Sequence, residues 1–581
     1  MSNKVAEISK LLSQDACSAW VANLWETYDN QRSKRKEEWL ESRKFTFATD
    51  TSTTSVGSLP WKNSTTIPKL CQIRDNLFCN YKSALFPNDN WAKWQARTMD
   101  DATKKKRDVI ETYMSNKTST PEFDQVLDQL LYDYIDFGMA FATPGFEANY
   151  KEFKGSIIPD FIGPTASRIS PEDIVFNPLA SHFNKTFKIV RSVKTIGELK
   201  RLAELQPEQR FWAKAIERRE DIANKAGAYS TEDFNKAASY QADGFGSLYE
   251  YYMGENVEIL EFFGDYHDPQ TGDLQTDRII TIVDRSVEVR NEPIPTWFQG
   301  APIYCVGWRN RPDNLWAMGP LDNLVGLQYR LDHLENLKAD AMDLSVHPPL
   351  KVYGEVEEFE YGPGSEIPID EGGDVQELGK NLNGVMAAAS EMAAIEERME
   401  VYAGAPREAA GLRTPGEKTL GEVMQLATAA GRIFQEKTTR FEKSLLEPLL
   451  NGMLEIARRN VQGTDVIRKV NKDLGIEEFI SVTAEDITAN GIIRPIGARH
   501  FAKQSQDLQN LISVFNSPLG QMIAPHTSGK GVMSFVEDIT GLSEYGIFSE
   551  GVALEEQQAL QSKQGNLQEE AAAIDSTETI V

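Results

Sequence analysis

The segment GLRTPGEKT at residues 411–419 differs by one residue from a phosphate-binding P-loop. A P-loop has the form G-x-x-x-x-G-K-[S/T], in which the lysine directly after the second glycine reaches the phosphates. In this chain Glu417 is inserted before Lys418, which places a negative charge where phosphate would bind. The preceding residues also have a helical pattern, whereas a P-loop follows a strand. We therefore predict that this segment is not a nucleotide-binding loop.

The same segment carries two signals for the start of a helix. Thr414 as N-cap, followed by Pro415 and then Glu417, forms a capping box. Thr419 with Glu422 forms a competing start one turn later. The sequence thus predicts a junction between a loop and a helix whose boundary could move.

The histidines and acidic residues do not define another catalytic or metal site. The chain lacks the G-x-S-x-G, H-E-x-x-H and dinucleotide-binding motifs. His267 lies beside Asp265 and Asp268, but turn residues follow at once and no further ligand is near in sequence. His333 falls within a leucine-rich helix, where we expect a polar position that faces a neighbour. We predict no catalytic residue, no metal site and no cofactor, and hence a protein that is not an enzyme.

The composition of the chain is strongly acidic. Its 581 residues include 87 Asp and Glu against 61 Lys and Arg, which gives 61 − 87 = −26. This balance opposes tight nucleic-acid binding, because such affinity comes mainly from Lys and Arg on phosphates. No apolar run approaches the roughly 18 residues of a transmembrane helix, so no membrane partner is expected.

The cysteines and the N-terminus indicate a reducing compartment. Four scattered thiols form no C-x-x-C pair, and the first residues lack the apolar core of a signal peptide. We expect synthesis in the cytoplasm and thiols that behave as small buried hydrophobes. The thiols belong to Cys17, Cys71, Cys79 and Cys305.

Helical spacing dominates the first part of the chain. It predicts a helix over 4–45, in which the mixed charges of 31–44 are typical of a solvated face. A second helix is predicted after Pro68. The basic run 104–107 lies in a polar helical stretch, and we expect it to face solvent rather than phosphate.

Short β-prone runs replace the helical pattern between residues 139 and 310. The clearest are 257–268 and 278–284, which a glycine-containing turn joins into a hairpin. We predict an α+β domain here, with helices on either side of a largely antiparallel sheet.

Two helices then flank an acidic insertion. Leucines at spacings of three and four predict an amphipathic helix over 319–346, and a second helix covers 384–405. From Glu355 to Glu377 the insertion holds nine acidic residues and no Lys or Arg. We predict an out-and-back excursion that carries a small β element away from the body of the protein.

The longest predicted helix covers residues 420–460. Pro448 lacks a main-chain donor, which predicts a kink. Strands are predicted within 464–497 and an amphipathic helix over 498–515, and the chain from Glu555 onward is expected to fray.

Three blocks in the C-terminal half resemble the portal, or head-to-tail connector, proteins of short-tailed bacteriophages. They are MGPLDNLVGLQYRLDHLENLKADAMDL (318–344) followed by HPPLKV, APREAAGLRTPGEKTLGEV (405–423) and DITANGIIRPIGARHFA (486–502). The blocks occur in the family's order, whereas the N-terminal half matches no sharp motif. The resemblance implies an α+β, predominantly helical portal fold with wing, stem, clip and crown regions. Such chains assemble as a ring, commonly of twelve copies, around a central channel.

The resemblance also implies a domain order along the chain. It assigns residues 1–318 to the wing, with a helical N-terminal part and then an α+β part, 319–346 to stem helix 1, 347–383 to the clip, 384–404 to stem helix 2, 405–419 to the tunnel loop, 420–497 to the wing return with its long kinked helix and strands, 498–550 to the crown and 551–581 to a flexible tail.

The implied function is that of a structural conduit at one capsid vertex, through which DNA is packaged and ejected. The implied partners are further copies of the chain, double-stranded DNA in passage but not tightly bound, the terminase motor, the major capsid and scaffolding proteins, and a tail adaptor. The implied location is the virion. Candidate DNA-channel residues in the tunnel loop are Arg407, Arg413 and Lys418. Candidate clip residues for docking the tail adaptor are Glu355, Glu357, Glu358, Glu360, Glu366 and Asp370.

Two other classes of protein remain open. A ring-forming tail adaptor or scaffold would lack a DNA channel, although adaptors are usually shorter chains. A nucleotide-dependent motor would hydrolyse nucleotide, which the disrupted P-loop opposes. Under the portal assignment, the charge of −26 opposes a tight grip on DNA but permits its passage, because an acidic wall limits counterion-release affinity.

Overall fold

The computed structural model describes residues 16–47, 63–86, 91–96, 101–205, 209–226, 255–346, 350–353, 374–377, 383–404 and 433–495, apart from short gaps inside these ranges. This part of the chain is mixed α/β, with helix as the larger component, in line with the predicted α+β class. It forms two compact units. The first comprises Met1–Ser83, Pro121–Gly145 and Thr165–Met453, and the second comprises Ala84–Thr120, Phe146–Pro164 and Leu454–Val581.

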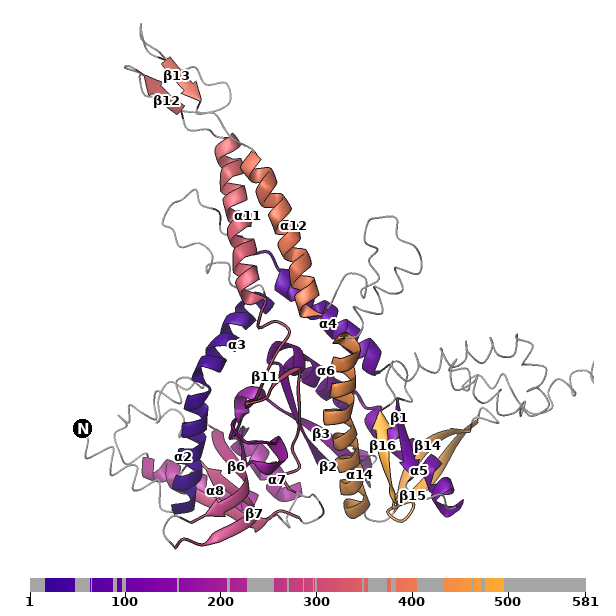
Figure 1. Ribbon diagram of the computed structural model, residues 1–581. Coiled ribbons are helices and arrows are strands. Elements are labelled where there is room, and N and C mark those ends of the chain that lie inside the picture. The colour runs from indigo at the N-terminus through magenta and orange to yellow at the C-terminus, as the bar shows by residue number, and fades with distance from the viewer. Residues whose placement is uncertain are drawn as a thin grey trace, which may run out of the picture. The chain divides into compact units, whose positions relative to one another are not determined.

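Figure 1 shows the helices and strands of the described chain. The helices are α2 (Ala16–Gln31), α3 (Ser33–Thr46), α4 (Lys69–Leu85), α5 (Asp101–Thr118), α6 (Pro121–Asp136), α7 (Ile196–Leu205), α8 (Phe211–Ala226), α11 (Val325–Val346), α12 (Asn383–Ala403) and α14 (Glu447–Asn460). The strands of the first unit's larger sheet are β4 (Ile174–Phe176), β5 (Lys188–Thr195), β6 (Asn256–His267), β7 (Leu274–Val283) and β8 (Val287–Pro293). The remaining strands are β1 (Ala92–Ala96), β2 (Met139–Phe153), β3 (Ser156–Ile169), β9 (Tyr304–Gly307), β10 (Arg309–Arg311), β11 (Asn314–Met318), β12 (Leu350–Tyr353), β13 (Asp374–Glu377), β14 (Thr464–Asn471), β15 (Ile476–Thr483) and β16 (Gly491–Pro495). None of the helices described is both long and apolar enough to cross a membrane.

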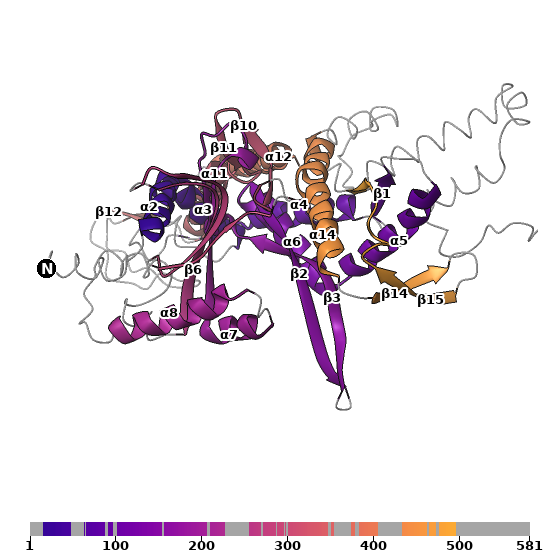
Figure 2. The ribbon, with the colours of Figure 1, turned by 90° about the horizontal axis from the view of Figure 1, so that it is seen from below.

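A five-stranded antiparallel sheet of order β4-β5-β6-β7-β8 forms one core of the first unit. Strands β6 and β7 are the predicted hairpin, with Ile259 opposite Val283. Because side chains alternate along a strand, β6 presents apolar residues to both faces. Leu260 lies on the face that packs against α2, whereas Val257 and Ile259 lie on the face that packs against α7 and α8. Helices therefore cover both faces, as predicted (Figure 2).

The predicted helix over 4–45 is broken where the structure describes it, because α2 ends and α3 begins around Arg32. This residue has φ −97° and ψ 7°, and its guanidinium donates to the main-chain oxygens of Pro171 and Ile174 at 2.6 and 2.9 Å. Arg35 is also buried and forms an ion pair with Asp322. The expectation of a solvated face over 31–44 is wrong for these two arginines, because both are buried.

An aromatic core holds α3 to the rest of the first unit. The Trp39 ring packs edge-on against Phe137 and Trp316, with centroid distances of 5.1 and 5.6 Å. Phe141 of β2 and Phe176 of β4 belong to the same buried group. The three-stranded sheet of order β3-β2-β9 thus shares its packing with α3 and with the end of the larger sheet.

The second unit pairs β1 with β16 and β14 with β15, both antiparallel. This confirms the strands that were predicted within 464–497. Lys117 of α5 forms an ion pair with Asp465 of β14 at 2.7 Å. In the basic run 104–107, Lys106 donates to the main-chain oxygen of Glu485 at 2.7 Å and Arg107 is exposed. The predicted solvent-facing helix is confirmed for Arg107, whereas Lys106 is partly buried and bonded to the main chain.

The long C-terminal helix changes its winding just before Pro448. Residues 433–441 are α-helical, Glu442–Leu446 form a π-helical turn, and α14 follows from Glu447. In a π turn the main-chain hydrogen bonds join residues i and i+5 instead of i and i+4. This changed pattern suits the neighbourhood of Pro448, which has no main-chain N–H to donate. The disturbance predicted at Pro448 therefore takes the form of this turn. The predicted first part of the helix, residues 420–432, lies outside the described residues.

None of the four cysteines forms a disulfide bond, and only one of them is buried as predicted. Cys17 is buried, Cys71 and Cys305 are partly buried, and Cys79 is exposed. The expectation of buried thiols is wrong for Cys79, because α4 places it on the side of the helix away from Leu77 and Tyr81, which are buried.

Candidate functional site

The two helices α11 and α12 form a helical hairpin with a pair of strands at its far end (Figure 1). There β12 pairs with β13, from Leu350 opposite Glu377 to Tyr353 opposite Asp374. The structure thus has two helices and a small β element where the sequence predicted them. We call α11 and α12 the stem helices. The 22 residues of α11 span about 33 Å at 1.5 Å per residue.

The first stem helix begins six residues later than predicted, at Val325 rather than at Gly319. The main-chain N–H of Gly319 donates to Asp322 at 2.7 Å, and that of Leu324 donates to the oxygen of Leu321 at 2.9 Å. These bonds form a turn instead of a helix. Asp322 is held in this turn by Arg35 of α3.

The stem helices bury one apolar face. Leu331 and Leu334 of α11 are buried, as are Met392, Ile395 and Met399 of α12. This accounts for part of the leucine stripe predicted from the sequence. It also explains why two helices joined only by a long insertion remain together, since burial of each such side chain is worth about 1.5–3 kcal/mol.

Large apolar side chains also lie on the exposed surface of both stem helices. On α11, Leu337 is 49% exposed and Met342 is 52% exposed. On α12, Met386 is 74%, Val401 is 55% and Tyr402 is 57% exposed. Leu337 belongs to the predicted leucine stripe, but the single chain does not bury it. A solvated helix face is normally polar, so this concentration of apolar groups is typical of an interaction surface.

A row of polar side chains on α11 holds an extended segment of the chain. The residues are Gln328, Asp332, Asn336 and Asp340, spaced by four so that they share one side of the helix. We call them the polar ladder, and we call Asn63 and Thr65–Ile67 the strap. Asn336 accepts from the Thr65 N–H at 2.7 Å and donates to the Thr65 oxygen at 3.2 Å.

Asp332 is the most deeply placed acid of the polar ladder. Its Oδ1 accepts from the Ile67 N–H at 3.0 Å and from the Gln328 side-chain amide at 2.8 Å. Burial raises the pKa of Asp332 to about 6, although these two hydrogen bonds act in the opposite direction. Reasoning from the sequence missed the polar ladder. The signal available was the four-residue spacing of polar groups beside the leucine stripe.

The base of the second stem helix is held by a buried lysine. Lys69, at the start of α4, is buried and forms an ion pair with Glu400 of α12 at 2.6 Å, with Glu396 at 3.5 Å. The strap leads directly into α4, so one continuous segment is bonded to both stem helices. This arrangement fixes where the hairpin leaves the first unit.

The residues that flank the segment 405–432 are held near each other. Gly404 closes α12 with φ +74°, and a Cβ placed on it would lie 3.5 Å from Cγ2 of Ile433, where the next helix begins. Phe434 stacks on Tyr81 with a centroid distance of 4.9 Å, and the Tyr134 hydroxyl donates to the Lys437 oxygen at 3.1 Å. The described residues on either side of this segment, Gly404 and Ile433, therefore lie close together.

The site residues predicted from the sequence fall in segments that the structure leaves undescribed. The predicted tunnel-loop residues Arg407, Arg413 and Lys418 lie within 405–432, as does the rejected P-loop. The predicted clip residues lie within 354–373, and the predicted crown lies within 496–581. The clip residues concerned are Glu355, Glu357, Glu358, Glu360, Glu366 and Asp370.

The histidines and the potential metal ligands do not converge where they can be located. His333 is exposed on α11, and His267 is exposed at the end of β6. In the described part of the chain, no three His, Cys, Asp or Glu side chains are placed to hold a metal ion.

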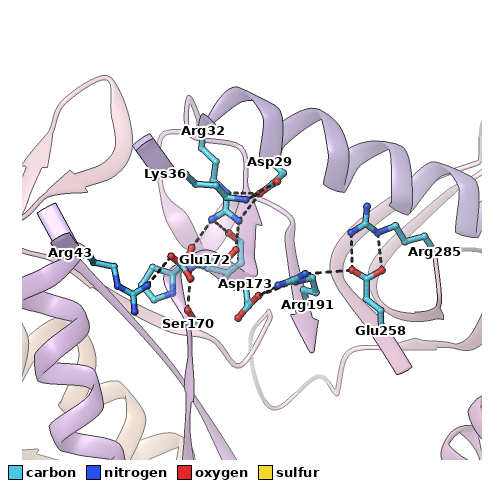
Figure 3. Close-up of polar contacts among 12 residues, drawn as sticks. Asp29, Arg32, Lys36, Arg43, Ser170, Glu172, Asp173, Arg191, Glu258 and Arg285 are labelled. Carbon is cyan, nitrogen blue, oxygen red and sulfur yellow. Dashed lines mark hydrogen bonds and ion pairs between the residues drawn. The ribbon is translucent and has the colours of Figure 1, made fainter. Parts of the chain in front are cut away.

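A chain of ion pairs ties α2 and α3 to the larger sheet (Figure 3). Arg285 donates to both carboxylate oxygens of Glu258 at 2.8 and 2.9 Å. Arg191 bridges Asp173 at 2.8 Å and Glu258 at 3.9 Å. Arg32 donates to main-chain oxygens of the same region, as described above. These groups satisfy one another, so we interpret the network as the attachment of the helices rather than as a catalytic site.

The comparisons with known proteins add no relative. No protein-family model matches the chain, and no curated protein matches it. The sequence blocks and the geometry of the stem helices are therefore the features that bear on function.

Proposed function

We propose that this chain is a portal protein, a structural ring subunit that forms a DNA conduit at one capsid vertex. The observation that carries the proposal is the set of large apolar side chains exposed on both stem helices. The three sequence blocks that resemble portal proteins also support the proposal, and the first of these blocks covers most of α11.

The exposed stem residues give a reason for assembly. A half-exposed Leu, Met, Val or Tyr leaves roughly 1 kcal/mol of transfer free energy that burial against a partner would gain. Five such residues amount to about 5 kcal/mol of gross stabilisation for each contact between copies, before the entropy of association. They lie on two different helices, so α11 of one copy can join α12 of the next in a head-to-tail contact, which forms a ring where the rotation between copies closes.

The role in DNA passage follows from the ring and from its charge. Each copy carries −26, so a ring of about twelve copies carries roughly −300. Such a wall does not hold DNA tightly, because few phosphates would exchange counterions for Lys or Arg. In this proposal the segment 405–419, with Arg407, Arg413 and Lys418, faces the channel as a tunnel loop. The β12–β13 end of the hairpin docks the tail adaptor through the clip carboxylates.

The proposed partners are the terminase motor, the major capsid and scaffolding proteins, the tail adaptor and DNA in passage, and the proposed location is the virion. A tail adaptor or scaffold without a channel is the second candidate, which the same exposed apolar residues also favour. The two differ in whether the ring has an open bore.

The test is the assembly state of the full-length chain, with matched surface variants. We expect the wild type to form closed rings with an open bore in electron micrographs. The triple variant M386S/V401S/Y402S should lose the rings, while the control L179S/L274S should keep them. Leu179 and Leu274 are 78% and 63% exposed but lie outside the stem helices, so the control removes a similar apolar surface.

Three outcomes would contradict the proposal. A monomeric wild type, or rings that survive the triple variant, would remove the assigned role of the stem helices. Rings without a bore would favour the adaptor or scaffold. Hydrolysis of nucleotide by the purified chain would favour a motor.

A further inference from the structure

The contact between the strap and α11 resembles strand pairing in which the second strand is replaced by side chains. The main-chain N–H groups of Asn63, Thr65 and Ile67 donate to the polar ladder at 2.7, 2.7 and 3.0 Å. Their acceptors are Asp340, Asn336 and Asp332, in that order. Two residues of extended chain advance about 6.6 Å and four residues of helix about 6.0 Å, so the two spacings match.

The alternation of amides and acids in the ladder fixes the register of the strap. Gln328 and Asn336 also donate to main-chain oxygens, at Ile67 (2.6 Å) and Thr65 (3.2 Å). A carboxylate cannot donate, so Asp332 and Asp340 can only accept from the strap. A slip of the strap by one helical turn would place acids opposite its carbonyl oxygens and would be disfavoured.

Asp332 is the position at which a single proton changes this contact. Asp332 is fully buried, yet its Oδ2 has no hydrogen-bond partner among the residues that the structure describes. When the acid is ionised, a carboxylate oxygen is therefore left without a donor in a buried place, which is unfavourable. When the acid is protonated, that charge is absent, and Oδ1 remains in position for the N–H of Ile67.

Several other charged groups of the neighbouring helices form ion pairs. On α11 itself, Arg330 and His333 are exposed, and the exposed Asp343 accepts from the Asn63 side chain at 2.7 Å. Asp340 accepts from Asn63 at the more exposed end of the ladder. The pairs are Arg35 with Asp322, Lys69 with Glu400 and Glu396, and Glu335 with Lys338.

We propose that the protonation state of Asp332 controls how firmly the strap is bound to the first stem helix. The strap is bound firmly when Asp332 is protonated and detaches more readily when Asp332 is ionised. Because the strap continues into α4, whose Lys69 pairs with α12, detachment of the strap loosens the attachment of both stem helices. The proposal concerns the single chain and does not depend on the portal function.

The direction of the pH effect follows from linkage. Burial raises the pKa of Asp332 from 3.8 in water to about 6 when the strap is held. The held state therefore binds the proton more tightly than the open state, and holding weakens as the pH rises from about 4 to about 7. Above about pH 7 both states are ionised and the effect is constant. From these two pKa values, the equilibrium constant for opening should rise about 20-fold between pH 4.5 and pH 7.

The test is hydrogen exchange of the strap amides in the full-length protein, corrected for the intrinsic pH dependence of exchange. In the wild type, protection of the peptide that contains Thr65 and Ile67 should fall about 20-fold between pH 4.5 and pH 7 and then stay level. In D332N, which keeps the size of the side chain without its charge, protection should be independent of pH. In the matched control D340N, the pH dependence at Ile67 should persist.

Two results would overturn the proposal. One is a wild-type strap whose protection does not change with pH, or rises as the pH increases. The other is a D332N strap that keeps the wild-type pH dependence. If D332N fails to fold, the wild-type measurements decide by themselves. A rise of the equilibrium constant for opening whose midpoint lies outside pH 5–7 would contradict the role of Asp332.

Discussion

Truncation of two leucines on α11 separates the folding of the chain from its assembly. Leu331 and Leu337 lie on the same helix and undergo the same chemical change to alanine. Leu331 is fully buried in the protomer, whereas Leu337 is 49% exposed. L331A should therefore open a cavity inside the protomer, and L337A should remove a group that the protomer does not bury.

The expected magnitudes differ clearly. Replacement of a buried leucine by alanine costs about 2–5 kcal/mol, and we expect about 3 kcal/mol for L331A. For L337A we expect less than about 1 kcal/mol in the protomer, because half of the side chain already contacts water. In the assembled ring, L337A should in addition weaken every contact between copies.

The assay must be local, because a chain with two compact units need not unfold in a single step. Hydrogen exchange of peptides within 325–346 gives the free energy of opening of α11 in dilute protein. Mass photometry of the same samples gives the fraction assembled. Equal losses of protection in L331A and L337A would refute the assignment of Leu337 to an outer surface. Unchanged assembly in L337A would refute its place between copies.

Three further substitutions test individual contacts. K69M should lower the melting temperature, because Glu400 loses its buried partner at a cost of about 3 kcal/mol. The double variant K69M/E400Q should recover part of the loss. A K69M protein as stable as the wild type would contradict a role for this pair. G404A should lower the free energy of opening at the end of α12 by about 1 kcal/mol in hydrogen exchange, because φ +74° disfavours a side chain. The control G326A in open space should be neutral or slightly stabilising, and equal effects would refute the assigned conformation. E258Q should lower the free energy of opening of β6 by about 3 kcal/mol in the same assay, because Arg285 loses a bidentate partner in a buried place. E292Q on the exposed end of β8 is the control and should change little, and equal losses would count against the network.

The sequence predicted elements well where one periodicity continued over many residues. The β6–β7 hairpin follows from two β-prone runs joined by a glycine-containing turn, and the first stem helix follows from leucines at spacings of three and four, because these patterns depend on local geometry. The burial of Arg32 and Arg35 could not be predicted in this way. Their main-chain acceptors lie more than one hundred residues away, and only the folded chain brings them together.

The polar ladder shows the same limit inside a well-predicted helix. Asp332 and Asn336 appear in the sequence as ordinary polar positions of an amphipathic helix, but the strap that buries them comes from residues 63–67. Conversely, Leu337 fits the apolar stripe and is exposed in the protomer. Local periodicity gives the face of a helix, and it does not give the partner that covers that face.

The central claim is that the stem helices join copies of this chain into an open ring. Class averages from electron micrographs of the purified full-length protein test it most directly. The account predicts closed rings with a bore wide enough for duplex DNA, and their loss in M386S/V401S/Y402S. Monomers, or closed assemblies without a bore, would contradict it.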